Sequence, residues 1–158
     1  MYDNILVTLD GSKLAECVLP HVETVYKGCE KPKVTILRVV EPVQLPYGEG
    51  MTGITLDMLR QAEADEKVEA KTYLEKIAAK MSKVGMAVQT KVLAGKAEEA
   101  IVDFINKNNY DLAILSTHGR SGISRWVWGS VADRILRHVC IPVMMVRAPG
   151  CGLLMKEK

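Results

Sequence analysis

The chain of 158 residues is 48% hydrophobic and 25% charged, a length and composition that suit one globular domain with a sizeable core. Its 21 basic and 19 acidic residues give a net charge of +2, too balanced for the strongly basic surface of a nucleic-acid or membrane-surface binder. No apolar run approaches the roughly 18 residues of a membrane span, and the first residues lack the basic start of an export signal, so we expect a cytoplasmic protein.

Five short runs rich in aliphatic and β-branched residues predict β-strands at residues 4–9, 33–40, 86–93, 110–117 and 141–148. The first, second and fourth runs are almost continuously apolar, as in strands that are covered on both faces. The third alternates apolar and polar residues, which indicates a strand nearer the edge of the sheet. Pro142 in the last run is typical of the start of a strand or of an edge strand.

Apolar residues at helical spacing predict an α-helix between each pair of strands. The first helix follows Ser12 as its N-cap, and we expect Pro20 to kink it because proline removes a backbone hydrogen bond. The second is long and charge-rich, from about Met58 to Val84, with Gly85 placed to end it. Its predicted core stripe consists of Ala70, Leu74, Ile77, Ala78 and Met81.

Two further helices complete the pattern. An amphipathic stripe from Ala97 to Ile105 predicts the third, and Ser130 followed by Asp133 resembles the capping box that begins a fourth. Alternating strands and helices predict an α/β fold, with one doubly wound parallel sheet and helices on both faces. We expect residues 1–148 to form this domain and residues 149–158 to form a tail.

The connection from Glu41 to Asp57 is abnormally long for a compact domain. It leaves the carboxyl end of the second strand, which is the edge where open α/β sheets bind ligands. Loops of this length are usually functional or disordered.

The most unusual segment, STHGRSGISRWVWGS at 116–130, joins the fourth strand to the fourth helix. A glycine-containing loop that ends at a helix N-terminus exposes backbone N–H groups to an anion. Gly119, Gly122 and Gly129 would let the backbone approach phosphate closely, and Ser130 would donate a hydroxyl or cap the helix. The GxxxxGK[ST] and GxGxxG nucleotide motifs are absent. From these residues alone, a phosphate site and a ligand-free loop both remain open.

Other side chains of this segment allow more than one interpretation. His118 would contact phosphates or carry a proton, or it is only a polar member of the loop. Arg120 and Arg125 would neutralise phosphate or lie solvated on the surface. For Trp126 and Trp128 we favour packing over stacking on a nucleobase.

The remaining reactive residues argue against a metal centre or a separate hydrolase site. Neither metal-ligand spacing nor suitably placed histidines accompany the four cysteines, which are Cys17, Cys29, Cys140 and Cys151. Ser12 lacks the context of a nucleophile elbow. The HxGH and SGGxD signatures of other adenine-nucleotide α/β enzymes are absent near the first turn.

Three motifs, in the same order and on matching elements, resemble the universal stress protein family over essentially the whole chain. Its nucleotide-binding members carry G-x2-G-x9-G-[ST] after the fourth strand, where this chain has Ser116-x2-Gly119-x9-Gly129-Ser130. ILVTLDGS at 5–12 resembles the family's first strand and acidic turn, and CIPVMMVR at 140–147 resembles its last strand. Ser116 departs from the pattern, because the family has glycine there.

The resemblance implies a five-stranded parallel sheet of order 3-2-1-4-5 that binds ATP at the carboxyl ends of strands one and four. Asp10 would lie beside the nucleoside, Thr8 would line the same pocket, and Val39 or Val40 would offer backbone groups to the adenine. A divalent ion, Mg or Mn, would accompany the phosphates, with Asp10 or Ser130 as ligands. The residues expected around the triphosphate are Gly119, Arg120, Gly129, Ser130 and Val131, with Ser116, His118 and Gly122 as further candidates.

The expected function is that of an ATP-binding stress-response or signalling module, with at most slow ATP hydrolysis. The resemblance also implies a homodimer formed through the last strand, Ile141 to Val146, whose apolar edge invites pairing. The alternative is a nucleotide-free dimeric interaction protein of the same fold. We expect an unidentified signalling partner, and neither nucleic acid nor a membrane.

Overall fold

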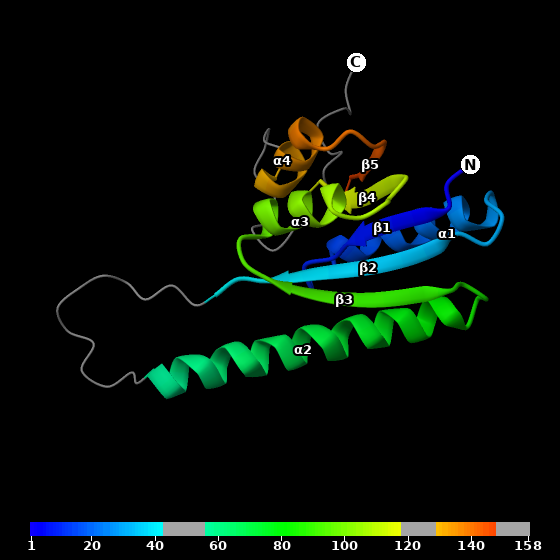
Figure 1. Cartoon of the computed structure of the whole chain (residues 1–158). Helices are drawn as coiled ribbons and strands as arrows, with labels where there is room; N and C mark the ends of the chain where they lie inside the picture. The colour runs from blue at the N-terminus through cyan, green and yellow to red at the C-terminus, as the bar shows by residue number, and fades with distance from the viewer. Residues whose placement is uncertain (43–55, 118–128, 148–158) are drawn as a thin grey trace, which may run out of the picture.

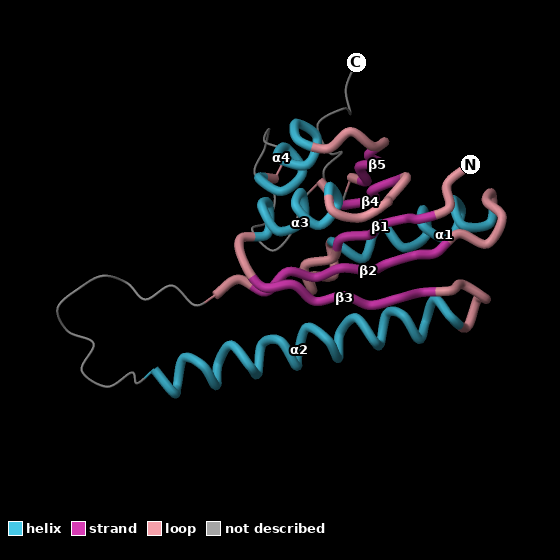
Figure 2. Tube along the Cα trace, viewed as in Figure 1, coloured by secondary structure: helices cyan, strands magenta, loops and turns pink. Residues whose placement is uncertain are grey.

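Five strands form the sheet at the centre of this computed structural model, which describes residues 1–42, 56–117 and 129–147. The strands are β1 (Asn4–Thr8), β2 (Lys33–Val40), β3 (Val88–Ala94), β4 (Leu112–Ser116) and β5 (Val143–Val146). They are ordered β3-β2-β1-β4-β5, and every neighbouring pair is parallel (Figures 1 and 2). The expected fold class and strand order are therefore confirmed, with β3 at an edge as its alternating sequence predicted.

Helices cover both faces of the sheet. They comprise a 3₁₀ helix η1 (Ala15–Val18) and the α-helices α1 (Leu19–Lys27), α2 (Leu56–Ser82), α3 (Ala97–Asn106) and α4 (Ser130–His138). Successive strand residues point to opposite faces, so Ile5 and Val7 pack in one core cluster and Leu6 in another. The first cluster includes residues of η1, α1 and α2, and the second includes residues of α3 and α4. This double burial explains why the central strands are almost wholly apolar.

The first helical segment differs from the expected kinked helix. A 3₁₀ helix ends at Val18, and the α-helix begins at Leu19 with Pro20 in its first turn. Proline is tolerated there because the N–H groups of the first turn have no intrahelical partner. The hydroxyl of Ser12 accepts the N–H of Ala15 at 3.1 Å, but the N-cap of the 3₁₀ helix is Leu14, so the predicted N-cap at Ser12 is wrong.

The long helix α2 agrees with its prediction. Four residues of the expected stripe are buried and Ala78 is partly buried against the same cluster; the buried four are Ala70, Leu74, Ile77 and Met81. Gly85 follows the helix with a φ of +84°, a left-handed conformation that favours glycine, and its N–H donates to Ser82 at 3.0 Å.

The predicted capping box of α4 is wrong. Gly129 occupies the N-cap, Ser130 is the first helical residue, and no side-chain capping bond forms. The helix starts there because the N–H of Asp133 donates to the carbonyl of Gly129 at 3.0 Å. The carboxylate of Asp133 instead forms an ion pair with Arg137 at 2.9 Å.

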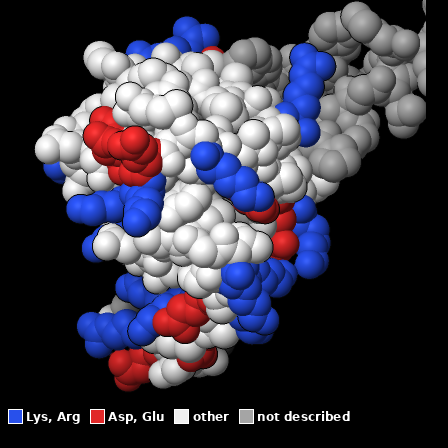
Figure 3. Space-filling model, turned by 90° about the vertical axis from the view of Figure 1, so that its right-hand side faces the viewer, with Lys and Arg blue, Asp and Glu red and all other residues white. Residues whose placement is uncertain are grey.

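The surface is of mixed charge on the face that Figure 3 shows, where basic and acidic side chains are interspersed. This pattern agrees with the balanced composition of the chain. Within the described ranges, none of the helices is both long and apolar enough to span a membrane.

Candidate functional site

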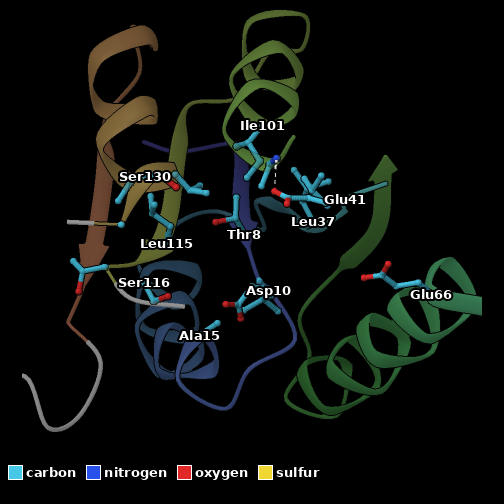
Figure 4. Close-up of a pocket in the computed structure, with 17 residues that line it drawn as sticks. Thr8, Asp10, Ala15, Leu37, Glu41, Glu66, Ile101, Leu115, Ser116 and Ser130 are labelled. Atoms are coloured by element: carbon cyan, nitrogen blue, oxygen red, sulfur yellow. Dashed lines mark hydrogen bonds between the residues drawn. The ribbon is translucent and has the colours of Figure 1, made fainter. Parts of the chain in front are cut away.

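A cleft of about 400 Å³ opens at the carboxyl ends of β1, β2 and β4, and it is also bordered by α2, α3 and α4 (Figure 4). A volume of this size falls within the roughly 300–1,000 Å³ of small-molecule sites. Its position is the switch point of the sheet, where connections from neighbouring strands leave in opposite directions. The lining residues are Thr8, Leu9, Asp10, Ala15, Leu37, Val39, Glu41, Glu66, Ala97, Ile101, Leu115, Ser116, Thr117, Gly129, Ser130, Val131 and Ala132.

Many of the predicted site residues meet in this cleft. These are Thr8, Asp10, Val39, Ser116, Gly129, Ser130 and Val131. Val40 is not among them, because it is buried and its carbonyl accepts the N–H of Gly95 at 3.0 Å. The predicted contacts His118, Gly119, Arg120 and Gly122 lie outside the described residues, as do Arg125, Trp126, Trp128 and Cys151. Whether the residues gathered here contact a ligand stays a prediction.

Asp10 is held by the turn that follows β1. Its Oδ1 accepts the N–H of Ser12 at 2.8 Å, and Gly11 between them has a φ of +90°. Aspartate favours this local turn because its short side chain reaches the backbone two residues on. Figure 4 shows the carboxylate directed toward the cleft. The turn therefore fixes an acidic group at the mouth of the site.

The opposite side of the cleft is built from the end of β4 and the start of α4. The N–H of Gly129 donates to the carbonyl of Thr117 at 3.2 Å, and the N–H of Thr117 donates to Val146 of β5 at 2.9 Å. Ser116 ends β4 in register with Val146. Among the described residues other than glycine, Lys31 alone has a positive φ, so the φ of Ser116 is in the ordinary range. A serine in place of the family's first glycine therefore causes no backbone strain.

The amino end of α4 is open to the cleft. Gly129, Ser130, Val131 and Ala132 all line it, and the N-cap has no side chain to occupy the free N–H groups. The first N–H groups of a helix have no intrahelical acceptor and carry a partial positive charge. This end of the site is therefore suited to an anion.

The backbone N–H and C=O groups of Val39 lie on the side of β2 that is directed toward β1 and the cleft. The carbonyl of Leu37 accepts the N–H of Leu9 at 2.8 Å on the β1 side, whereas that of Val40 accepts Gly95 on the β3 side. Alternate residues of a parallel strand direct their peptide groups to the same neighbour. Val39 thus shares the side of Leu37 and lies beyond the last residue of β1. Of the two predicted adenine contacts, Val39 is the one in a suitable position.

Several cleft residues were missed by sequence reasoning. The sequence places Glu41 at the start of the long connection, and Ala97 and Ile101 in an amphipathic stripe, without marking them as site residues. Glu66 comes from the charge-rich helix α2 and faces the cleft from across the sheet (Figure 4). The position of Glu41 directly after a parallel strand could have predicted its place in the cleft, because such residues gather at the ligand-binding edge. Glu66 had no comparable signal among the many charges of α2.

Arg38 of β2 is a buried charged residue that meets two residues of α2. The guanidinium of Arg38 lies 5.6 Å from the ring centre of Tyr73 and 3.9 Å from the carboxylate of Glu69. Arg38 is only 2% exposed. Burial raises the pKa of Tyr73 to about 12, and the carboxylates of Glu16 and Asp10 act in the same direction. Tyr73 therefore stays protonated at physiological pH.

No preformed metal centre is evident in the described part of the chain. Groups of three or more histidine, cysteine or acidic residues that could hold a metal ion are absent there. Among the described residues, Cys17, Cys29 and Cys140 form no disulfide.

Comparison with known proteins gives one consistent family. A family model described as the Universal stress protein family matches residues 1–147. Universal stress protein MJ0577 of Methanocaldococcus jannaschii is 26% identical over 156 residues, which cover 93% of this chain and 96% of that protein. The solved structure of MJ0577 superimposes with a TM-score of 0.80, covering 95% of this chain and 99% of that one at 25% identity.

Two more distant structures share the fold and contain nucleotides. A universal stress protein family protein of Arabidopsis thaliana with AMP bound has a TM-score of 0.63 at 14% identity, with 93% of this chain and 92% of that chain covered. A universal stress protein in complex with cAMP has a TM-score of 0.62 at 17% identity, with coverages of 92% and 97%. At these identities the likeness establishes the fold alone.

Proposed function

Because the chain belongs to the universal stress protein family, we propose that its cleft binds an adenine nucleotide, ATP with a divalent ion, and that binding serves signalling in a stress response. The observation that carries this proposal is the placement of two complementary groups at one cleft. Asp10 stands at the end of β1, and the open amino end of α4 begins after Gly129 at the end of β4. The AMP and cAMP complexes of proteins with this fold support a nucleotide as the ligand.

Each part of a nucleotide has a chemical counterpart in the cleft. The phosphates meet the N–H groups of Ser130 and Val131 and the positive end of the α4 dipole. The carboxylate of Asp10 accepts hydrogen bonds from ribose hydroxyls. The base lies against Leu37 and Ile101, where the peptide groups of Val39 can pair with a purine edge.

A divalent metal ion would be held by the protein and the ligand together. Magnesium and manganese prefer oxygen ligands, and magnesium is usually bound through one or two protein groups together with phosphates and water. Asp10 and Ser130 both line the cleft and supply a carboxylate and a hydroxyl oxygen. Either residue would anchor the ion while the phosphates complete its coordination.

The module acts by binding and has at most slow ATP hydrolysis. The described part of the cleft lining contains neither lysine nor arginine to neutralise the charge that develops on a transferred phosphoryl group. A nucleotide that joins the end of β1 to the start of α4 changes the surface that surrounds the cleft. A partner that recognises this surface would then respond to the nucleotide state.

We further propose a homodimer formed through β5. Among the described strands, β5 is the last in the sheet, and β4 is its one neighbour. Its other side presents backbone N–H and C=O groups, which can pair with the same strand of a second copy. The dimer and the nucleotide site involve different edges of the sheet and are compatible.

Isothermal titration calorimetry with Mg-ATP tests the nucleotide proposal directly. We expect one ATP per chain with a dissociation constant below hundreds of micromolar. Mass spectrometry of small molecules released by denaturing the purified protein provides an independent test. Absence of both binding and co-purified nucleotide would overturn the proposal and favour the nucleotide-free interaction protein.

A further inference from the structure

Two helices direct their amino ends at the same cleft. Ala97, the first residue of α3, and Ser130, the first residue of α4, both line it. Each helix end carries a partial positive charge and unpaired N–H groups, so each is attractive to phosphate on general grounds. A phosphate-bearing ligand with a base at its other end can therefore enter in two orientations unless the two helix ends differ.

The amino end of α3 is occupied by carboxylate. Oε1 of Glu41, just beyond the end of β2, accepts the N–H of Ala97 at 3.2 Å (Figure 4). The N-cap residue Lys96 makes no side-chain capping bond, so Glu41 supplies the cap from another element. Glu98 and Glu99 are acidic residues in the first turn of α3, and Glu99 forms an ion pair with Lys96 at 3.9 Å. The carboxylate of Glu41 thus occupies the first N–H of α3, and the charge of Glu98, unpaired among the residues that the structure describes, makes this end less attractive to an anion.

The amino end of α4 has the opposite character. Its N-cap is Gly129, which has no side chain, and no capping bond from a side chain is formed. Asp133 is the acidic residue of its first turn, and its charge is balanced by Arg137 at 2.9 Å. Among the described residues, no side chain caps the positive end of this helix.

We propose that Glu41 is a specificity-determining residue that sets the orientation of the ligand. By occupying the amino end of α3, it confines phosphate to the amino end of α4. The apolar part of the cleft near Leu37 and Ile101 is then left to the uncharged end of the ligand. This proposal rests on the proposed function, since it assumes that the cleft receives a molecule with one phosphorylated end.

The test compares Glu41→Gln and Glu41→Ala with the wild type, using inorganic tripolyphosphate as the probe. Calorimetry at low ionic strength should show tripolyphosphate binding about three- to tenfold tighter in both variants, because one negative charge near the helix end has been removed. Addition of tripolyphosphate should shift the amide resonance of Ala97 strongly in Glu41→Ala, less in Glu41→Gln, and not in the wild type. Glu41→Gln retains an oxygen that can accept the Ala97 N–H, so it separates loss of charge from loss of the helix cap.

Glu66→Gln is the matched control, because it removes the same charge from the cleft lining without exposing a helix end. We expect a smaller gain in tripolyphosphate affinity and no shift at Ala97. Unchanged tripolyphosphate affinity in both Glu41 variants, or an equal gain in Glu66→Gln, would overturn the proposal.

ATP titration of the wild type runs in parallel. Its failure would count against the proposed function, whereas the behaviour of Ala97 in the variants still decides the role of Glu41.

Discussion

The backbone N–H of Gly129 donates to the carbonyl oxygen of Thr117 at 3.2 Å, which joins the end of β4 to the start of α4. A Cβ atom added at Gly129 would lie 3.4 Å from that same oxygen. The φ of Gly129 is −55°, a value that any residue adopts. The described backbone therefore tolerates a side chain at this position, and we attribute the glycine to close approach by a ligand.

Gly129→Asp should abolish ATP binding while leaving the protein folded. Aspartate is a favoured N-cap residue, so thermal stability should be unchanged or slightly higher. Its carboxylate, however, would occupy the N–H groups that the phosphates need and would repel them. Calorimetry should show ATP affinity reduced by at least about tenfold, in line with the strength of hydrogen bonds to charged groups. Gly129→Ala is the uncharged control and should bind ATP more weakly than the wild type but better than Gly129→Asp. Normal affinity in Gly129→Asp would place the phosphates elsewhere.

Asp10→Asn should weaken binding most for nucleotides that carry ribose hydroxyls. Asparagine keeps an oxygen that can accept the Ser12 N–H, so the turn after β1 should persist. Loss of a charged acceptor is expected to reduce ATP affinity by about tenfold. Titration with 2′,3′-dideoxy-ATP provides the comparison, since this ligand lacks the hydroxyls. An equal loss for both nucleotides would show that Asp10 does not act through the ribose.

Tyr73→Phe should leave the fold intact and stabilise it. The hydroxyl of Tyr73 is buried and has no hydrogen-bond partner among the residues that the structure describes. An unsatisfied buried hydroxyl costs about 1–3 kcal/mol, of which a phenylalanine would recover a part by removing the group. Urea unfolding at pH 7 should show a free energy of unfolding higher by about 1 kcal/mol. A clear loss of stability would indicate that the hydroxyl is hydrogen-bonded in solution.

The same residue predicts a pH dependence. Burial raises the pKa of Tyr73 from 10.0 to about 12, so the folded state holds this proton more tightly than the unfolded state. Ionisation of Tyr73 therefore does not affect the free energy of unfolding below pH 10, and it lowers this free energy as the pH rises from 10 toward 12. The difference in unfolding free energy between wild type and Tyr73→Phe should therefore widen at high pH, with the wild type falling faster. Parallel pH profiles above pH 10 would contradict the raised pKa.

The secondary structure was largely predictable because each element leaves a local pattern. Strands that are buried on both faces need continuous aliphatic runs, and the long amphipathic stripe of α2 ends at a glycine with positive φ. The boundaries at Pro20 and Ser130 were less predictable. One-residue shifts in the first turn decide whether proline is tolerated and which residue is the N-cap.

The candidate site was predictable only where its residues are close in sequence to a motif. Asp10, Gly129 and Ser130 adjoin the ends of β1 and β4, which topology brings to one edge of the sheet. Glu66 reaches the cleft from the middle of a helix of 27 residues. Which of the charges on that helix faces the cleft depends on how α2 crosses the sheet, and this packing leaves no local pattern.

Asp111→Ala should destabilise the protein without changing ATP affinity. Oδ2 of Asp111 accepts the N–H groups of Asp3 and Asn4 at 2.9 and 2.8 Å, and so holds the beginning of β1. Loss of both bonds should lower the free energy of unfolding by about 1–3 kcal/mol. These residues lie at the amino ends of the strands, at the opposite edge from the cleft. Chemical unfolding and calorimetry together check the prediction, and weaker ATP binding at an unchanged fold would contradict it.

Met145→Pro should convert the proposed dimer to a monomer while leaving the sheet intact. The carbonyl of Pro142 accepts the N–H of Ala113 at 3.0 Å, and the carbonyl of Val146 accepts the N–H of Thr117 at 2.9 Å. The peptide groups of the even-numbered residues of β5 therefore point toward β4. The N–H of Met145 therefore faces the free edge, and proline removes it without loss of a bond to β4.

Met144→Pro is the matched control, because it removes an inward N–H and should destabilise the monomer itself. A charged substitution at Met145 would be less informative, since this side chain packs partly against the second core cluster. Light scattering should give twice the 17.4 kDa chain mass for the wild type and the single mass for Met145→Pro. A folded Met145→Pro protein that remains dimeric would exclude pairing through the edge of β5.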